Sequence, residues 1–152
     1  MLPREYFVTT GAGESNTSAL NAFDNALIAA EISQCNLVPV SSIIPVDAVE
    51  VERKVVEAGS ITFVVMARFE GKRGQKISAG IGYLRPRNEK YGTVVEATGR
   101  MSRITLERRI SKTLDEVIGV RGLEGSGSKI VTKDFEIKMK YGSVISALVF
   151  VP

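Results

Sequence analysis

The last strand-like segment of the chain, residues 144–151, is apolar at every position except Ser146. Successive side chains of a strand point to opposite faces of its sheet, so both faces of this segment are apolar. A strand of this kind belongs in the middle of a sheet that is covered on both sides. We therefore expect a layered fold with this segment near its centre.

The order of the other elements indicates the fold class. Apolar periodicity and turn residues predict the order strand, helix, several strands, helix, two strands. The expected strands are residues 5–10, 36–44, 49–56, 61–70, 77–85, 91–98, 129–138 and 144–151, and the expected helices are residues 18–32 and 103–120. Because strand and helix do not alternate strictly, we expect an α+β fold with mainly antiparallel sheets, in a single domain of residues 1–152.

The first helix is expected to bury one stripe of side chains. Its apolar positions recur at helical spacing, at Leu20, Phe23, Leu27 and Ala30. Asp24 then lies at the border of this stripe. The preceding stretch, residues 11–16, is rich in glycine and small polar residues and is predicted to form a turn.

Missing residue types exclude much common enzyme chemistry. The chain has no histidine and one cysteine, Cys35. This excludes Ser-His-Asp and Cys-His catalysis, histidine-based metal helices, disulfides within the chain and cysteine zinc sites. We expect a buried Cys35, no bound metal and a reducing, cytoplasmic location.

The formal net charge of +3 is small, and the basic residues are mixed with glutamates. No nucleic-acid-binding motif accompanies them. No apolar run approaches the ~20 residues that span a bilayer. Neither nucleic acid nor a membrane is expected as a partner.

Two glycine-containing stretches resemble nucleotide-binding loops in part. After Gly11-Ala12-Gly13 the third glycine is replaced by Asn16, and in residues 122–129 the lysine comes one place late, before a predicted strand. A phosphate loop needs a helix N-terminus after the glycines. Both stretches are therefore interpreted as turns.

The Ser41-Ser42 pair stands in the apolar, proline-flanked stretch Asn36-Leu-Val-Pro-Val-Ser-Ser-Ile-Ile-Pro45. One interpretation is a strand end whose hydroxyls satisfy turn hydrogen bonds. The wider context favours another. Together with Leu20-Asn-Ala-Phe-Asp24 and Gly92-Thr-Val-Val-Glu96, this stretch resembles the pyruvoyl-dependent arginine decarboxylases, and the resemblance runs the length of the chain.

The resemblance implies a four-layer αββα sandwich that assembles as a homotrimer with active sites between neighbours. It also implies cleavage between Ser41 and Ser42 into a β chain of residues 1–41 and an α chain of residues 42–152. Ser42 would become a covalent pyruvoyl group that forms a Schiff base with the substrate amine. The implied reaction converts arginine to agmatine and CO2, as in polyamine biosynthesis, with no other cofactor.

Roles for further residues follow from the same resemblance. Glu96 matches the proton donor, and its apolar neighbours are expected to raise its pKa. Asp24 matches the carboxylate that binds the substrate guanidinium, and Leu27 would line the aliphatic part of the substrate. Asn36 matches a polar group at the cleavage site.

The chain also departs from the family pattern, with Glu31, Ser33 and Cys35 near the expected substrate end of the site. One added side chain changes substrate discrimination by about 1–3 kcal/mol, so these departures bear on the substrate more than on the reaction type. The alternative hypothesis is a non-enzymatic oligomer that binds a small cation or a protein partner. In that case the serine pair would be structural.

Overall fold

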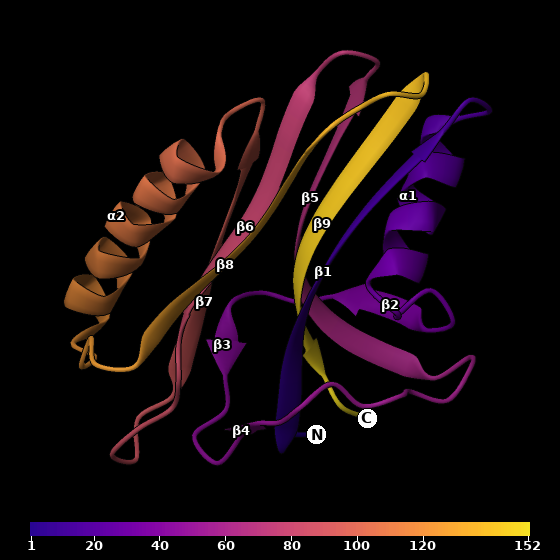
Figure 1. Cartoon of the computed structure of the whole chain (residues 1–152). Coiled ribbons are helices and arrows are strands. Elements are labelled where there is room, and N and C mark those ends of the chain that lie inside the picture. The colour runs from indigo at the N-terminus through magenta and orange to yellow at the C-terminus, as the bar shows by residue number, and fades with distance from the viewer.

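The chain folds into four layers in the order helix, sheet, sheet, helix (Figure 1). The computed structural model describes residues 1–152. α1 covers the outer face of a five-stranded sheet, sheet 1, and α2 covers the outer face of a four-stranded sheet, sheet 2. The expected α+β sandwich of mainly antiparallel sheets is confirmed.

Sheet 1 has the strand order β2-β5-β9-β1-β4. Its strands are β1 (Glu5–Ser15), β2 (Asn36–Pro39), β4 (Val49–Glu50), β5 (Ile61–Lys72) and β9 (Tyr141–Phe150). The inner pairs, β5 with β9 and β9 with β1, are antiparallel, and the two edge strands pair in parallel. β9 is the middle strand and is buried from Gly142 to Phe150. This confirms the position predicted from its apolar faces.

Sheet 2 is antiparallel throughout, with the order β3-β7-β6-β8. Its strands are β3 (Ile43–Ile44), β6 (Lys76–Leu84), β7 (Gly92–Gly99) and β8 (Ser128–Glu136). Alternate residues of β6 face the space between the sheets, where they join the main core: Ile77, Ala79, Ile81 and Tyr83. Tyr6, from sheet 1, meets Tyr83 edge to face in this core.

α1 (Ala19–Ala29) lies on sheet 1 through its smallest side chains. Ala22 and Ala26 are buried, whereas Leu20 is 72% exposed, so the prediction that Leu20 belongs to the buried stripe is wrong. The reason is the close approach of the helix to the glycines of β1. A Cβ atom on Gly11 would lie 2.1 Å from the Ala26 carbonyl oxygen, so the face that meets β1 is made of alanines and the bulkier residues lie to the side.

Two predicted boundaries around α1 also differ. β1 continues through residues 11–15, so the predicted turn there is wrong, and these residues pair with β9. The helix was expected to reach Ile32 but ends at Ala29. Glu31 adopts a left-handed φ of 59°, which is incompatible with a continuing helix.

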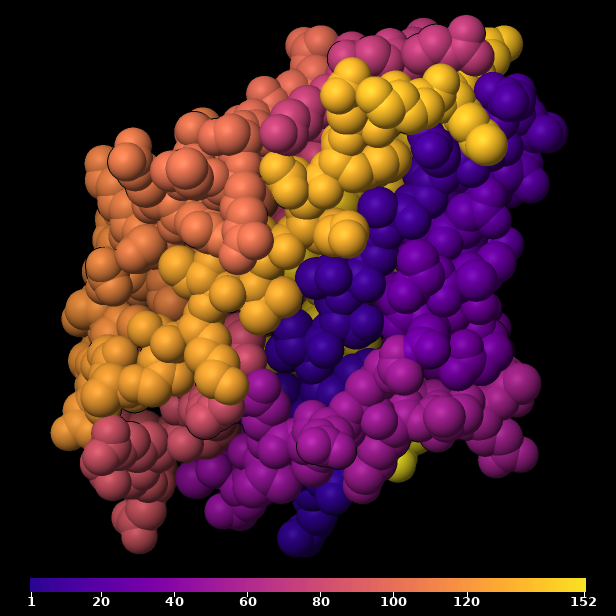
Figure 2. Space-filling view, in the orientation of Figure 1, coloured from indigo at the N-terminus to yellow at the C-terminus, as the bar shows by residue number.

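The stretch 36–44, predicted as one extended segment, belongs to two sheets. β2 pairs with β5 in sheet 1, and β3 pairs with β7 in sheet 2. Residues 40–42, here called the link, cross between the sheets. In Figure 1 the chain passes behind β1 as it crosses from β2 to β3. Figure 2, in the same orientation, shows purple parts of the chain along the foot of the molecule. The strand expected over residues 49–56 is limited to β4, because the charged residues after it leave the sheet.

α2 (Arg103–Arg121) spans sheet 2 and buries Leu106, Ile110, Leu114 and Ile118 at intervals of four residues. Ser102 caps its N-terminus by accepting a hydrogen bond from the Thr105 N–H, as expected for an N-cap serine. Gly122 ends it with a left-handed φ of 63°. The expected turn follows, and β8 then begins at Ser128, one residue before the predicted start at Lys129.

Candidate active site

The serine pair lies on the link, where the backbone is fixed on both sides. The Val40 N–H donates to the Val64 carbonyl in sheet 1 at 2.9 Å. The Ser42 carbonyl accepts from the Val94 N–H in sheet 2, also at 2.9 Å. The scissile peptide expected between Ser41 and Ser42 is therefore held between two sheets. Ser41 is exposed and Ser42 is half-buried.

Ser41 also lines a pocket of about 330 Å³ at the foot of the molecule. Its walls are mainly apolar and come from the link, β3, β5, β9 and the N-terminal residues: Met1, Pro3, Val40, Ile43, Pro45, Phe63 and Phe150. The pocket gives a ligand access to the link beside Ser41.

Glu96 lies near the serine pair in the register of sheet 2. Val94, which is hydrogen-bonded to Ser42, points into the core between the sheets. Glu96, two residues further along β7, points to the same side of the sheet. Desolvation raises the pKa of Glu96 above the ordinary value, although the side chain reaches solvent at the edge of the sheet. The direction of this shift agrees with the one predicted from the apolar neighbours.

A second hollow, here called the groove, lies between α1 and the β2 edge of sheet 1. It has a volume of about 440 Å³. It is lined by Phe23, Leu27, Cys35, Asn36, Leu37, Val38, Pro39, Met66 and Arg68. Leu27 and Asn36, two of the expected site residues, thus meet here. Asp24 is exposed on α1 next to Phe23.

Asn36 is also engaged within the chain. Its side-chain amide donates to the Gly59 carbonyl at 2.8 Å, and its backbone N–H donates to the Ser60 carbonyl. Both contacts fix the start of β2 beside β5. Cys35 is half-buried and lines the groove, so the expectation of a fully buried Cys35 is wrong.

Within one chain the site residues form two groups. Ser41, Ser42 and Glu96 gather around the link, whereas Leu27 and Asn36 line the groove with Asp24 close by. The groove runs along the whole of β2, from Asn36 to Pro39, and the link follows directly after it. Ser41, Ser42 and Glu96 are not among the residues that line the groove.

Two residues of the site escaped the sequence reasoning. Val94 contacts Ser42 through its backbone N–H, which no side-chain pattern reveals. Arg68 lines the groove with its guanidinium carbon 3.4 Å from the centre of the Phe23 ring. Its alternation with the groove residue Met66 along β5 is the one signal that could have placed it on this face.

A separate polar cluster joins the sheets on the other side of the link. The Glu50 carboxylate accepts hydrogen bonds from the Tyr83 hydroxyl at 2.8 Å and from Arg85 at 2.6 Å. Burial alone would raise the pKa of Glu50, but these hydrogen bonds and the nearby cations lower it overall. Burial, and then the charge of Glu50, raise the pKa of Tyr6 to about 12. The cluster borders a hollow of about 540 Å³.

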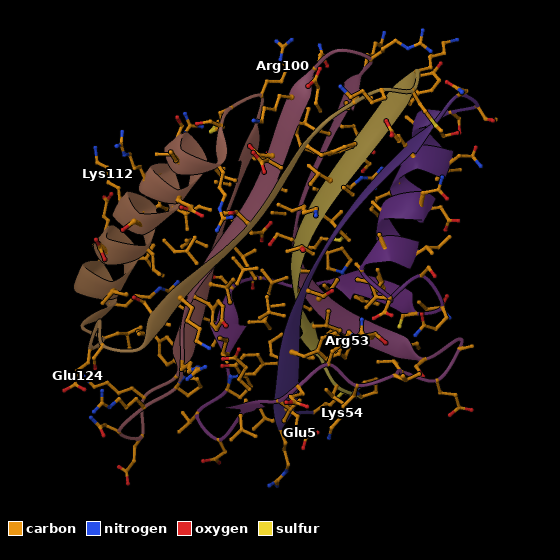
Figure 3. The ribbon with its side chains drawn as sticks, viewed as in Figure 1. Glu5, Arg53, Lys54, Arg100, Lys112 and Glu124 are labelled. Carbon is orange, nitrogen blue, oxygen red and sulfur yellow. The ribbon has the colours of Figure 1, made fainter.

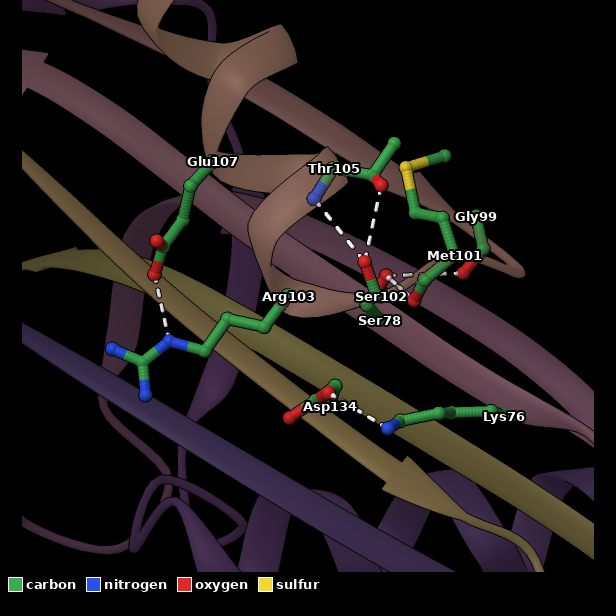
Figure 4. A network of polar contacts seen from close by, with 9 residues as sticks. All are labelled: Lys76, Ser78, Gly99, Met101, Ser102, Arg103, Thr105, Glu107 and Asp134. Carbon is green, nitrogen blue, oxygen red and sulfur yellow. Dashed lines mark hydrogen bonds and ion pairs between the residues drawn. The ribbon is translucent and has the colours of Figure 1, made fainter.

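Other charged groups lie on solvent-facing surfaces. Arg100 and Lys112 point outward on the α2 side, whereas Glu5, Arg53 and Lys54 gather near the foot of sheet 1, where Lys54 pairs with Glu5 (Figure 3). At the start of α2, Arg103 pairs with Glu107, and Lys76 of β6 pairs with Asp134 of β8 (Figure 4). No group of three or more acidic or cysteine side chains is arranged to hold a metal ion. Neither helix has the length and apolar character needed to cross a membrane.

Comparison with known proteins places the chain in a family. Residues 5–152 match the family model of pyruvoyl-dependent arginine decarboxylase. The chain is 30% identical to the protein of that name from Pyrococcus abyssi and 32% identical to the one from Thermococcus kodakarensis, with 99% of this chain and 96% of each relative covered. It is 36% identical to the one from Methanothermobacter thermautotrophicus, covering 94% of this chain and 93% of that protein. The chain therefore belongs to the pyruvoyl-dependent arginine decarboxylases, a family of lyases that depend on a covalently bound pyruvoyl group.

Proposed function

We propose that this protein cleaves itself between Ser41 and Ser42 and then decarboxylates arginine to agmatine and CO2. The observation that carries the proposal is the position of the serine pair on the link, in a chain that matches the decarboxylase family over residues 5–152. Ser42 is half-buried and its backbone carbonyl is fixed, so the residue fits the precursor of a group that must be held in one orientation.

The cleavage uses the chain's own atoms. The Ser42 Oγ attacks the carbonyl carbon of Ser41, and the peptide C–N bond is exchanged for an ester bond. Loss of the Ser42 α-proton and of the ester oxygen leaves Ser41 as a carboxylate and residue 42 as a dehydroalanine. Water then replaces the amino nitrogen, which leaves as ammonia. The hydrogen bonds at Val40 and Ser42 support this step, since they fix the backbone on both sides of the reacting bond.

A pyruvoyl group supplies a ketone that captures the substrate amine and a conjugated carbonyl that accepts the electrons released with CO2. The chain's contribution at this carbonyl is the Val94 N–H, which donates to the residue 42 oxygen at 2.9 Å. A fixed N–H donor favours negative charge on the oxygen that it meets. This contact therefore orients and polarises the carbonyl of residue 42.

Glu96 is the proposed proton donor. Desolvation raises the pKa of its carboxyl, so the protonated form persists to a higher pH than for a free glutamate. A general acid works best when its pKa lies near the working pH. The position of Glu96, two residues beyond the Val94 contact and on the same side of β7, supports this role.

Asp24 and the groove are proposed to bind the substrate side chain. A carboxylate can take a guanidinium through two parallel hydrogen bonds, and Leu27 offers an apolar wall for the methylene groups. Because Ser41, Ser42 and Glu96 do not line the groove of their own chain, we propose a homotrimer in which the groove of one subunit serves the link of its neighbour. Asn36, exposed at the end of the groove, would then reach the neighbour's cleavage site.

Denaturing mass spectrometry of the purified protein tests the proposal first. We expect two fragments, residues 1–41 and 42–152, with no amine at the start of the larger one. Incubation with arginine and cyanoborohydride should add the mass of the trapped substrate to the larger fragment, and arginine should release CO2. An intact chain that traps no amino acid would refute the proposal.

A further inference from the structure

Arg68 is the only charged residue among those that line the groove. It projects from the face of β5 that is turned toward α1, and its neighbours in the groove wall are Phe23, Leu27 and Met66. A pocket for a guanidinium substrate is thus lined by a guanidinium of the chain itself. This arrangement needs an explanation, because like charges in one groove repel.

The guanidinium of Arg68 lies over the Phe23 ring, with its central carbon 3.4 Å from the ring centre. Arg and an aromatic face attract each other within about 6 Å of the ring centre. The same guanidinium donates from Nε to the Glu70 carboxylate at 2.9 Å, and Nη2 pairs with that carboxylate as well. The Arg68 side chain is 40% exposed, and Glu70 does not line the groove. Arg68 can therefore leave the ring toward solvent and keep its ion-pair partner.

We propose that Arg68 occupies the place on the Phe23 ring that the substrate guanidinium takes, and that it sets the affinity of the groove for arginine by competing for this ring. The inference rests on the proposed function, since it assigns the guanidinium end of the substrate to Asp24 and its neighbourhood. Phe23 directly precedes Asp24 on α1, and Phe23 is the residue of the two that lines the groove, so its ring is the aromatic face that the groove offers to a guanidinium. One ring face accommodates one guanidinium, and the substrate must displace Arg68 to stack there.

The test replaces Arg68 with Leu, which matches the apolar wall of the groove. We expect the KM for arginine to fall by about 3- to 10-fold with kcat unchanged, the range that corresponds to one cation–π contact. Arg68→Lys, which keeps the charge and loses the planar stack, should lie between the wild type and the leucine variant. Arg68→Gln provides a polar replacement if the leucine variant folds poorly. Arg108→Leu, on the exposed face of α2, is the matched control and should not change KM.

A double-variant cycle isolates the ring. Phe23→Leu should raise the KM for arginine, and adding Arg68→Leu to it should bring little further change, because no ring is left for which to compete. If Arg68→Leu lowers KM equally in the presence and absence of Phe23, the effect is general charge repulsion and the proposal is wrong. An unchanged or raised KM in the single Arg68→Leu variant would also overturn it.

A binding measurement separates this inference from the proposed function. Calorimetry with agmatine on the Ser42→Ala protein requires neither cleavage nor turnover. We expect Arg68→Leu to tighten agmatine binding in that background by the same 3- to 10-fold. If this tightening occurs while the wild type releases no CO2 from arginine, the proposed function fails and the inference on Arg68 stands. If CO2 is released and agmatine binding is unchanged, only the inference on Arg68 fails.

Discussion

The two helices cover the outer faces of the sandwich in different ways. α1 has 11 residues and rests on β1 through backbone contact, with glycines on the strand and alanines on the helix. α2 has 19 residues and rests on β6 through long aliphatic side chains that lie over Gly80 and Gly82. The short helix leaves the β2 edge of sheet 1 uncovered, and the groove lies there. The long helix closes its face. The helix that packs by backbone contact, α1, thus leaves part of its sheet free for a candidate site. The helix that packs through long side chains, α2, covers its sheet and serves as support.

The largest expected difference between the region of the link and the α2 side of the molecule concerns the proposed self-cleavage. Ser42→Ala removes the attacking oxygen, so the protein should remain one chain of 152 residues by denaturing mass spectrometry. Ser102→Ala, at the start of α2, should be cleaved as fast as the wild type. Cleavage of the Ser42→Ala protein at residue 41 would contradict the proposed mechanism.

A substitution at Glu96 tests whether the candidate site around the link includes β7 of sheet 2. Glu96→Gln should lower kcat for arginine by about 10²- to 10⁴-fold, the usual contribution of a general acid, and leave cleavage intact. In the wild type kcat should fall as the pH rises through the raised pKa of Glu96, since the carboxyl then loses the proton it donates. Glu116→Gln on α2 is the control. A pH profile that is the same in Glu96→Gln and the wild type would exclude this role.

Glycine substitutions compare the two kinds of packing directly. In Gly11→Ala the new Cβ would meet the backbone oxygen of Ala26, so α1 must move, and we expect a loss of about 3 kcal/mol or more in the free energy of unfolding. In Gly80→Ala the Cβ would lie 2.6 Å from the end of the Ile110 side chain, which can rotate. The expected loss there is about 1–2 kcal/mol. Urea denaturation of both variants measures the two losses in the free energy of unfolding. Equal losses would contradict the proposed difference between backbone packing at α1 and side-chain packing at α2.

Glu50 joins the two halves and makes their association sensitive to acid. Glu50→Ala leaves the Tyr83 hydroxyl, on a side chain only 1% exposed, without its acceptor and should cost about 1–3 kcal/mol. The folded-state pKa of Glu50 is lowered, so its contribution is present above the pKa of an unfolded glutamate and is lost as the pH falls through the folded value. Stability measured between neutral and acid pH should therefore decline less in Glu50→Gln than in the wild type.

The smallest expected effect is at the helix caps. The hydroxyls of Ser18 and Ser102 accept backbone N–H groups at 3.0 Å and 3.3 Å. Alanine at either position should lower the free energy of unfolding by about 1 kcal/mol, as measured by thermal or urea denaturation. Because the two caps are alike, a much larger loss at Ser18 would show that the shorter helix depends more on its cap than on its contact with β1.

The sequence predicts the layers well and the groove poorly, for physical reasons. Apolar residues on both faces of residues 144–151 require a covered central strand, and the alternation in β6 identifies the core between the sheets. The apolar stripe predicted for α1 is partly wrong, because Leu20 is exposed. The cause is the close approach of the helix backbone to Gly11 and Gly13, which the sequence of the helix alone does not reveal. Family motifs point to Ser42 and Glu96. Arg68 carries no motif, and its place in the groove depends on the pairing of β2 with β5, which local patterns do not determine.

The ladder between β1 and β9 bears on how the two fragments would hold together after the proposed cleavage of the link. It runs from Tyr6 opposite Phe150 to Ser15 opposite Tyr141, so residues 1–41 supply the interior strand β1, together with the edge strand β2, to a sheet whose other three strands belong to residues 42–152. The proposed cleavage would turn a unimolecular folding reaction into an association of two peptides, whose midpoint of unfolding would depend on protein concentration. The intact precursor refolds from one chain, whereas the fragments must first find each other. If the chain is cleaved as proposed, folding before cleavage would therefore be the productive order.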